Sequence, residues 1–541
     1  MQGTMMNYPL TLAHLFERAG TLFGASQIVS RLPDKSLHRY SYQDFHRRAQ
    51  ALGGALQAAG LKPGDRVATL MWNHYAHLEA YFAIPCAGGV LHTLNLRLHP
   101  DDIAYIANHA GDRFLIVDDI LLPLYEKFRD KTKFERVIVV PLTGAAVAAA
   151  YQDYEQFIAG APAMQVPAPD ENAAAGMCYT SGTTGSPKGV VYSHRALVLH
   201  SMTCAMGDVL GLGQSSSLCP VVPMFHVNAW GLPFTAVMVG CKLVLPGPHL
   251  DAMSLLDLYQ SEQVTFTAGV PTIWAGILQA LENHPTQWKL VPGMCMLVGG
   301  AAAPESMIRA FDRHHLRVLH AWGMTETTPL GTTSYIKHGL SGWSEDARYA
   351  LRVKQGVPAP FVEVRAMTER GAAPWDGATM GELQVRGPWI AASYYRLDSE
   401  SDKWTPDGWF CTGDVATIDA EGYVKITDRT KDLIKSGGEW ISSQDLENAL
   451  AGHPAIQEAA VIAVPHEKWD ERPLAVVVLK PGQSTHEREL REFLAPKFAK
   501  FWIPDGFEFV TEIPRTSTGK MMKAKLREQF RGALNKPLRA G

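Results

Sequence analysis

The sequence predicts an α/β protein with a large N-terminal domain of layered α/β subdomains and a β-rich subdomain, followed by a small α+β C-terminal domain. Helical and strand patterns alternate through residues 10–140 and again from 176 to about 335, which is typical of helices covering a largely parallel sheet. Residues 352–430 instead contain short strand-like runs separated by turns, and from residue 431 the order becomes helix, strand, strand, helix. A chain of 541 residues is also too long for one hydrophobic core, so several domains are expected.

The first alternating region contains a clear helix start at Ser41. A serine followed three positions later by Asp44 can satisfy free N–H groups of a first helical turn, and apolar residues then recur through 45–60. Residues 142–176 are rich in Ala and Pro and show little periodicity, so a surface helix and a connecting loop are expected there. The other elements expected before residue 140 are strands within 61–71 and 113–119 and helices over 77–90 and 101–110.

The last third of the chain divides into two patterns. The strand-like runs of the β-rich subdomain are 356–367, 381–388 and 421–428. The C-terminal unit is expected to contain helices over 442–453 and 487–496 and strands over 458–465 and 473–480. The predicted domains are therefore 1–430, with the β-rich part at about 352–430, and 431–541.

Composition limits the classes of function. Hydrophobic residues make up 46% and charged residues 19% of the chain, which is ordinary for a globular protein, and a net charge of −4 gives no electrostatic case for nucleic acid or an anionic membrane. Seven scattered cysteines without a C-x-x-C pair argue against a disulfide framework or a zinc site. Neither a signal peptide nor a membrane span is evident, so a cytoplasmic location is expected.

The most informative segment is YTSGTTGSPKG, residues 179–189. Its glycines allow the backbone to approach a ligand closely, its hydroxyls can bond phosphate oxygens, and Lys188 supplies the opposite charge, so the segment indicates a polyphosphate cradle. It differs from the common P-loop because Lys188 lies three residues after Gly185 and is followed by Gly189. A simple linker is disfavoured because strand-like apolar residues flank the segment on both sides.

Five further segments carry candidate site residues. In HAWGMTETTP (320–329), Glu326 could bind Mg²⁺, Thr325 a phosphate and Trp322 a purine ring, although a buried Trp and a surface Glu are the more common interpretation of such residues alone. GGAAAP (299–304) supplies small residues beside which a planar base could lie.

In residues 407–442, Asp414 is a plausible acceptor for ribose hydroxyls, whereas the alternating charges of 428–432 alone favour a solvated surface. Gly437 and Gly438 permit a narrow ligand to approach closely. PRTSTGK (514–520) ends in a lysine that alone would be ordinary surface decoration. PMFHVNAW (223–230) contains His226 and Trp230 among apolar residues, where a histidine is more often a packed core residue than a catalyst.

Taken together, in this order and spacing, these segments resemble the adenylate-forming enzyme superfamily, which includes acyl-CoA synthetases, peptide-synthetase adenylation domains and luciferases. The resemblance covers essentially the whole chain. FHVNAWGLPF (225–234), FTAGVPTIW (266–274) and VPHEKWDERPLAVVVLK (464–480) are most similar to bacterial medium- and long-chain fatty acyl-CoA synthetases. The resemblance implies ATP, Mg²⁺ and CoA as cofactors: an acid and ATP give an acyl-adenylate and pyrophosphate, and CoA then displaces AMP.

The resemblance also implies roles for individual residues. Lys520 would bridge the carboxylate and the α-phosphate, Lys435 would act near AMP, Thr180 and Glu326 would bind Mg²⁺, and the small C-terminal domain would turn about Lys431 between the two steps. The ATP-binding residues it implies are Thr180, Ser181, Gly182, Thr183, Thr184, Gly185, Lys188, Gly300, Ala301, His320, Ala321, Trp322, Gly323, Thr325, Glu326, Asp414, Ile426, Arg429, Lys431 and Lys435.

The acyl and CoA sites are implied in the same way. His226, Val227 and Trp230 would form the gate of an apolar acyl tunnel, with Gly299, Gly323 and Thr327–Leu330 as further wall candidates. Gly437, Gly438 and Trp440 would line the pantetheine path. The chain departs from the family pattern at Trp322, where many members have Tyr, and at Cys411, where a basic residue is common.

Three alternatives to a fatty acid–CoA ligase remain open at this point. They are a CoA ligase for an aryl or sulfur-bearing short acid, an enzyme that transfers the acyl group to a carrier protein, and a non-catalytic nucleotide-binding protein. The last is disfavoured because Lys188, Glu326, Asp414, Lys435 and Lys520 are all present. Pairing into a homodimer through residues 1–30 is a further expectation, although a helix packed on its own domain would explain these apolar residues equally well.

Overall fold

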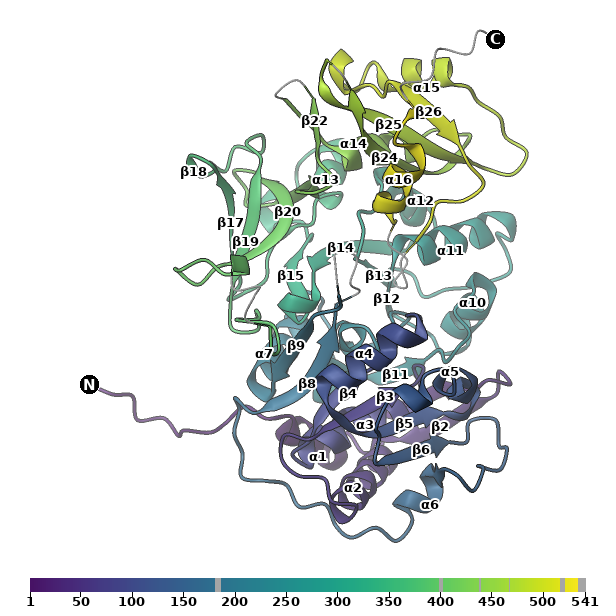
Figure 1. Ribbon diagram of the computed structural model, residues 1–541, viewed down its shortest axis with the longest axis vertical. Helices are drawn as coiled ribbons and strands as arrows, with labels where there is room; N and C mark the ends of the chain where they lie inside the picture. Colours follow the sequence, from purple (N-terminus) through teal and green to yellow (C-terminus); the bar gives the residue numbers. More distant parts are fainter. Residues whose placement is uncertain (181–185, 398–401, 437–438, 467, 516–520, 534–541) are drawn as a thin grey trace.

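The computed structural model of the protein describes residues 1–180, 186–397, 402–436, 439–466, 468–515 and 521–533. The strands of these residues form four sheets. In Figure 1 the two largest sheets occupy the lower and middle parts of the molecule, the β-rich sheet lies at one side, and the C-terminal sheet lies at the top. The predicted α/β class is confirmed.

One large sheet has the strand order β7-β6-β5-β3-β4-β8-β9, and its pairs are parallel except for β8 with β9. Helix α3 is buried from Ala76 to Cys86, as expected for a helix packed between a sheet and other helices. The strands are β3 (Arg66–Leu70), β4 (Val90–Thr93), β5 (Asp112–Asp118), β6 (Arg136–Val140), β7 (Gln152–Asp153), β8 (Ala174–Tyr179) and β9 (Gly189–Ser193). The accompanying helices are α2 (Tyr42–Ala58), α3 (Tyr75–Cys86), α4 (Pro100–Ala110), α5 (Leu122–Tyr125) and α6 (Tyr154–Ile158).

The second large sheet has the order β16-β15-β14-β13-β12-β10-β11-β1-β2 and combines the start of the chain with its middle. Its strands are β1 (Gln27–Arg31), β2 (Leu37–Ser41), β10 (Ser217–Pro220), β11 (Lys242–Leu245), β12 (Phe266–Gly269), β13 (Cys295–Val298), β14 (Arg317–Gly323), β15 (Leu330–Thr333) and β16 (Val357–Pro358). The helices of these segments are α1 (Leu12–Leu22), α7 (His194–Ala205), α8 (Val227–Trp230), α9 (Leu232–Val239), α10 (Ala252–Ser261), α11 (Pro271–Asn283), α12 (Glu305–Arg313) and α13 (Glu345–Arg352).

Two smaller sheets complete the fold. The β-rich subdomain is an antiparallel sheet of β17 (Glu363–Thr368), β18 (Gly371–Ala372), β19 (Gly381–Arg386), β20 (Phe410–Ile418) and β21 (Val424–Arg429). The C-terminal sheet contains β22 (Ile434–Ser436), β23 (Glu439–Ile441), β24 (Ile456–His466), β25 (Asp470–Leu479) and β26 (Gly506–Phe509). Its helices are α14 (Ser443–Ala451), α15 (Glu487–Leu494) and α16 (Lys523–Phe530).

The local sequence signals agree with the observed elements in most places. Ser41 and Asp44 form the reciprocal capping box at the start of α2, which confirms that prediction. The helix expected over 77–90 is too long, because α3 ends at Cys86 and Gly88 follows with φ of 90°, a left-handed conformation that glycine adopts without strain.

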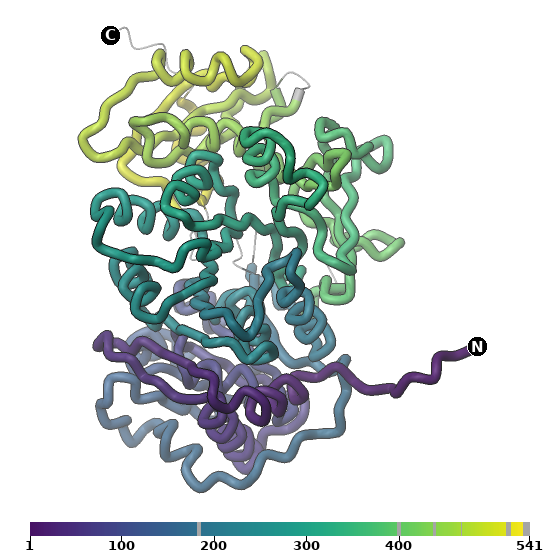
Figure 2. The backbone as a smooth tube through the Cα atoms, turned by 180° about the vertical axis from the view of Figure 1, so that it is seen from behind, coloured from purple at the N-terminus to yellow at the C-terminus, as the bar shows by residue number. Residues whose placement is uncertain are grey.

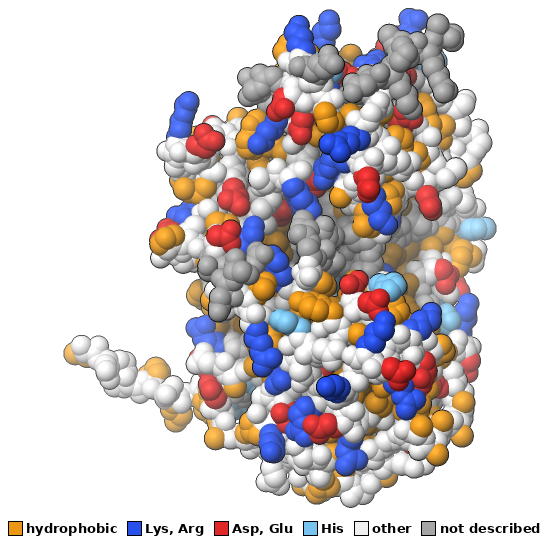
Figure 3. Space-filling view, viewed as in Figure 1, with side chains coloured by type: hydrophobic (Ala, Val, Ile, Leu, Met, Phe, Trp, Pro, Cys, Tyr) orange, Lys and Arg blue, Asp and Glu red, His pale blue; other side chains and the backbone are white. Residues whose placement is uncertain are grey.

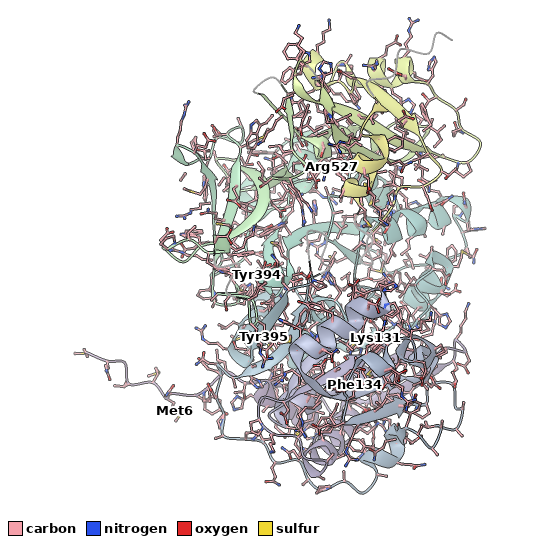
Figure 4. All side chains as sticks on the ribbon, viewed as in Figure 1. Met6, Lys131, Phe134, Tyr394, Tyr395 and Arg527 are labelled. Atoms are coloured by element: carbon pink, nitrogen blue, oxygen red, sulfur yellow. The ribbon has the colours of Figure 1, made fainter. Side chains whose placement is uncertain are left out.

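The C-terminal sheet contacts the β-rich subdomain through charged and polar groups. The Ser443 N–H and hydroxyl donate to Asp428 of β21 at 2.7 and 2.5 Å, and beside them Arg527 of α16 donates at 2.8 Å to Asp432 in the link between β21 and β22. Figure 4 shows Arg527 at this junction. These bonds hold the C-terminal sheet in the orientation seen here.

The surface and termini bear on the predicted partners. On the face in Figure 3, lysines and arginines are interspersed with aspartates and glutamates, as expected from the small net charge. The first residues extend away from the body of the protein (Figures 1 and 2). Among the described residues, no helix combines the length and apolar character needed to cross a membrane. All seven cysteines are free, as the sequence predicted.

Candidate active site

The phosphate-loop segment connects two adjacent strands. It leaves β8 after Tyr179 and enters β9 at Gly189, and these two residues are paired in the antiparallel ladder. The Thr180 N–H donates to the Lys188 carbonyl at 2.9 Å, and the Lys188 N–H donates to the Thr180 hydroxyl at 3.0 Å. The two ends of the loop are thus fixed to each other, while the predicted residues Ser181, Gly182, Thr183, Thr184 and Gly185 lie outside the described residues.

Gly189 has a steric reason to be glycine. A Cβ atom at this position would lie 2.9 Å from the Tyr179 ring, which is closer than real Cβ contacts allow. The Tyr179 hydroxyl in turn lies 2.7 Å from Nδ1 of His109 on α4. The end of the loop therefore lies against a packed aromatic side chain.

Glu326 is brought next to this loop from a different sheet. It lies in a short 3₁₀ turn (Thr325–Thr327) after β14, and only 5% of it is exposed. The Tyr192 hydroxyl of β9 donates to the Thr325 carbonyl at 2.8 Å. The Tyr394 hydroxyl donates to Glu326 Oε1 at 2.6 Å, and Lys188 Nζ lies 5.1 Å from the centroid of the same tyrosine ring. Thus the structure brings together Lys188, Thr325 and Glu326, three of the residues predicted to bind ATP.

Tyr394 and Tyr192 were not predicted from the sequence. Each is separated from its partner by more than sixty residues, 68 for Tyr394 with Glu326 and 133 for Tyr192 with Thr325. No local motif marks either tyrosine, so only the tertiary structure reveals them.

Trp322 and Asp414 form a second cluster. The Trp322 indole N–H donates to Asp414 Oδ2 at 2.8 Å, and Arg429 Nε lies 3.3 Å from Asp414 Oδ1. Asp414 on β20 and Arg429 on β21 are directly paired in the sheet, and Ile426 lies on the same strand. The benzo ring of Trp322 packs on Gly331, where a Cβ would lie 2.4 Å from Cζ3. The aromatic ring of Trp322 therefore lies next to the Asp414 carboxylate, which can accept hydrogen bonds from hydroxyl groups.

The remaining residues predicted around the base lie on or beside β14. His320 is buried, and its Nδ1 lies 3.1 Å from the Val353 carbonyl. Burial lowers the pKa of His320 to about 4, so the imidazole is neutral near pH 7. Gly323 needs to be glycine because a Cβ would lie 1.8 Å from the Pro329 carbonyl oxygen. The other predicted residues here are Ala321 on β14 and Gly300 and Ala301 after β13.

The predicted acyl gate has an unusual backbone. Val227, Asn228, Ala229 and Trp230 all have positive φ angles, between 45 and 58°, so α8 is a left-handed turn. Left-handed helical conformation costs roughly 1–2 kcal/mol per L-residue, so the surrounding packing must hold it. Val227 is buried, and the Trp230 ring lies against Gly299, where a Cβ would be 3.0 Å from Cη2. His226 precedes the turn and is half-buried.

The predicted residues of the C-terminal part are only partly described. Lys435 Nζ lies 5.9 Å from the Trp440 ring centroid, and the Lys435 N–H donates to Glu471 at 2.9 Å. Lys431 lies in the connection between β21 and β22. Gly437, Gly438 and Lys520 lie outside the described residues.

The oxygen donors of the site suit Mg²⁺ that arrives with a phosphate ligand. Mg²⁺ is usually bound by one or two carboxylates together with substrate phosphates and water. Glu326 supplies one carboxylate and Thr180 one hydroxyl at the loop end. Among the described residues, no cluster of three or more His, Cys, Asp or Glu side chains could hold a metal alone. A carboxylate and a hydroxyl of this kind fit Mg²⁺ that is held together with phosphate oxygens.

Comparison with known proteins finds relatives that match nearly the whole chain. The AMP-binding enzyme family model matches residues 17–395, and the AMP-binding enzyme C-terminal domain model matches residues 445–520. The chain is 50% identical to the long-chain-fatty-acid–CoA ligase of Thermus thermophilus, covering 98% of this chain and 97% of that protein. It is 44% identical to the medium-chain-fatty-acid–CoA ligase of Ectopseudomonas oleovorans, covering 98% of each.

Two further similarities extend this comparison. The chain is 45% identical to a 3-methylmercaptopropionyl-CoA ligase of Ruegeria pomeroyi, covering 99% of this chain and 100% of that protein. Among solved structures, the anthranilate CoA ligase AuaEII in complex with anthranoyl-AMP is similar, with a TM-score of 0.87, 26% identity and coverage of 98% of this chain and 99% of that one.

Proposed function

Because the chain belongs to the AMP-binding enzyme family, we propose that it is an ATP-dependent ligase for a medium- or long-chain fatty acid. In the first reaction an oxygen of the acid bonds to the α-phosphorus of ATP and pyrophosphate leaves. In the second, the CoA sulfur bonds to the carbonyl carbon of the acyl-adenylate and AMP leaves. The observation that carries this proposal is the 50% identity to a long-chain-fatty-acid–CoA ligase over 98% of this chain.

The described side chains fit a bound nucleotide. Asp414, held by Trp322 and Arg429, would accept hydrogen bonds from the ribose hydroxyls. Lys188 would lie by the β- and γ-phosphates, and Glu326 would face the metal. Trp322 would stack on adenine opposite Gly300 and Ala301.

The first reaction brings a carboxylate up to a phosphate, and these two anions repel each other. Mg²⁺, bound through Thr180 and Glu326, would neutralise phosphate charge when it is present. Lys188 and Lys520 would add positive charge around the reacting groups and orient them, which is most of what phosphoryl-type chemistry requires.

The second reaction needs a different set of groups at the same centre. We propose that the domain formed by residues 431–541 turns about Lys431 against residues 1–430, which would replace Lys520 by Lys435, Gly437 and Gly438. Such a rotation would break the Ser443–Asp428 bonds, which join the two sides of Lys431 in the present orientation.

The identity of the acid is tested by a series of acids from two to eighteen carbons, with AMP release measured in the presence of ATP and CoA. We expect the highest kcat/KM for medium or long chains. The main competing candidate is a sulfur-bearing short acid, favoured by the 45% identity to 3-methylmercaptopropionyl-CoA ligase. If kcat/KM is highest with that acid, the substrate is the sulfur-bearing acid and not a fatty acid. If AMP is released only when a carrier protein is present, the acceptor is the carrier protein and not CoA.

We also propose that the protein forms a homodimer through its N-terminal segment. Met5 and Met6 are 85% and 90% exposed at the start of a segment that extends into solvent (Figure 4 labels Met6), and apolar side chains there gain by burial against a partner. The end of the segment is held by the Leu10 N–H, which donates to Glu171 at 2.8 Å, and by Tyr8, whose ring stacks on His14 with 4.5 Å between centroids. Light scattering should give a dimer for the full chain and a monomer after removal of residues 1–9; identical masses would contradict this.

A cytoplasmic location is proposed from the thiols. All seven cysteines are free, and six of them are buried, which suits a reducing compartment. Fractionation of cells that express the native chain should recover the activity with the cytoplasmic fraction, and recovery with membranes would contradict the proposal.

A further inference from the structure

Tyr394 lies between two charged groups of the nucleotide site. Its hydroxyl donates to Glu326 Oε1 at 2.6 Å, and its ring centroid lies 5.1 Å from Lys188 Nζ. We propose that Tyr394 is a positioning residue that sets the metal-facing carboxylate and the phosphate-facing ammonium in one arrangement before Mg²⁺ and ATP bind. This inference rests on the proposed function, because that function supplies Mg²⁺ and ATP as the ligands.

The segment Trp389–Arg396 holds Tyr394 in place through its backbone. The Ala391 N–H donates to the Glu326 carbonyl at 2.8 Å, and the Tyr395 N–H donates to the Gly189 carbonyl at 2.8 Å. Figure 4 shows Tyr394 and Tyr395 one after the other at the junction of the β-rich subdomain with β8 and β9. One short segment is therefore bonded both to the carboxylate's own residue and to the end of the phosphate loop.

Two side chains fix the same segment further. The Thr328 hydroxyl donates to the Trp389 carbonyl at 2.6 Å, and the Trp389 indole N–H donates to the Leu330 carbonyl at 2.9 Å. Trp404 packs edge-on against the Tyr394 ring, with 5.2 Å between centroids. The ring therefore has little freedom to turn away from either charged group.

The hydroxyl of Tyr394 matters because Glu326 is buried. Glu326 is 5% exposed and Tyr394 is 8% exposed, so water contributes little to solvating the carboxylate. A buried charge needs a hydrogen-bond donor, and an O–H to carboxylate distance of 2.6 Å lies in the range of strong, charge-assisted bonds. The hydroxyl carries no charge, so Glu326 keeps its full negative charge for a metal ion.

The ring of Tyr394 acts on the other charge. An ammonium group within about 6 Å of an aromatic centroid is attracted to the ring face. At 5.1 Å the ring favours positions of Lys188 Nζ on the side of the loop nearest Glu326. The two halves of the same side chain therefore have separable effects, the hydroxyl on metal binding and the ring on phosphate binding.

Calorimetric titration of the full-length protein with ATP, once in EDTA and once in excess Mg²⁺, tests this division. The dissociation constant in EDTA divided by that in Mg²⁺ measures how much Mg²⁺ strengthens ATP binding. Both constants come from the same protein, so partial loss of folded material does not change this ratio. Tyr394→Phe keeps the ring and removes the hydroxyl. It should lower this ratio roughly ten-fold, as loss of a hydrogen bond to a charged group does, and leave binding in EDTA within about two-fold of wild type.

Tyr394→Leu removes the ring as well, and it should in addition weaken ATP binding in EDTA by roughly three- to five-fold. Tyr395→Phe is the matched control, because it keeps the main-chain bond to Gly189 and the ring that meets His109. In a Glu326→Gln background, Tyr394→Phe should change the ratio by less than about two-fold, since its partner carboxylate is gone.

Equal ratios for Tyr394→Phe and Tyr395→Phe would overturn the proposal. A ten-fold fall of the ratio when Tyr394→Phe is added to Glu326→Gln would overturn it as well. Both titrations read nucleotide binding without any acid. Failure of the wild-type protein to activate a carboxylic acid would therefore count against the proposed function and leave the result on Tyr394 separate.

Discussion

Replacing Trp322 by phenylalanine should weaken the hydrogen bonds between Asp414 and the ribose hydroxyls of ATP, while an aromatic face remains for adenine. Asp414 is 5% exposed and has two partners, the Trp322 indole N–H at 2.8 Å and Arg429 Nε at 3.3 Å. The Arg429 side chain is 39% exposed, so solvent weakens its pairing, and the indole is the better placed partner. Loss of a hydrogen bond to a buried charge costs about 2 kcal/mol, which corresponds to roughly 30-fold in rate.

The assay compares kcat/KM for ATP with that for 2′,3′-dideoxyATP, which lacks both ribose hydroxyls. For Trp322→Phe we expect kcat/KM for ATP to fall roughly 30-fold and that for the dideoxy analogue to fall less than about three-fold. The reason is that a displaced Asp414 weakens the binding of a nucleotide only if that nucleotide donates hydrogen bonds to it, and the dideoxy analogue has no hydroxyl that could do so. Asp414→Asn supplies the reference for losing the carboxylate charge itself.

Equal losses with the two nucleotides would refute this reasoning, because Trp322 would then act through stacking alone. The double variant Trp322→Phe/Asp414→Asn gives a second check. If Trp322 acts through Asp414, the two substitutions together should cost clearly less than the sum of their separate effects.

Three further predictions concern other parts of the chain. Lys520→Ala should nearly abolish acyl-adenylate formation yet leave thioester formation from supplied acyl-adenylate largely intact, and equal loss of both half-reactions would contradict its role. Gly299→Ala would place a Cβ 3.0 Å from the Trp230 ring, so the KM for the fatty acid should rise roughly five-fold or more while the KM for ATP stays within two-fold; parallel changes in both constants would argue against a gate. Burial raises the pKa of Glu447 to about 6 despite Lys523 at 2.7 Å, so the native carboxyl binds its proton more tightly than the unfolded one. Relative to Glu447→Gln, the wild-type protein should therefore lose about 1.5 kcal/mol of unfolding free energy between pH 4.5 and 6.5, and equal pH slopes in denaturant titrations would exclude this.

Elements with local signals could be predicted from the sequence, and their arrangement in space could not. The cap at Ser41 acts within a few residues and marks the start of a helix directly, whereas the end of α3 before Gly88 was missed because the helix was expected to run to residue 90. The pairing of β1 with β11 joins strands more than two hundred residues apart, and its register depends on how the intervening helices pack. The nine-stranded order of the second sheet follows from such long-range contacts.

The same distinction applies to the site. Lys188, Glu326 and Asp414 stand in motifs whose spacing indicates their chemistry, and the structure groups the first two around Tyr394. Tyr394, which supports Glu326, has no such signal, and Trp322 was predicted for its ring and not as the partner of Asp414. Tyr394 lies 68 positions from Glu326, and Trp322 lies 92 positions from Asp414. The spacing of residues within one motif therefore does not show which residue of another segment contacts it.

These supporting side chains share a chemical property that explains their use. Glu326 is held by a phenol and Asp414 by an indole, and both are neutral donors presented by buried aromatic rings. A lysine or arginine in either place would satisfy the buried carboxylate equally well, but it would also compensate the negative charge that a metal ion needs. A neutral donor fixes the position of the carboxylate and leaves its charge for the ligand. The half-exposed Arg429 at 3.3 Å from Asp414 is consistent with this reasoning, because ribose hydroxyls, unlike a metal ion, need only an acceptor and tolerate a cation nearby.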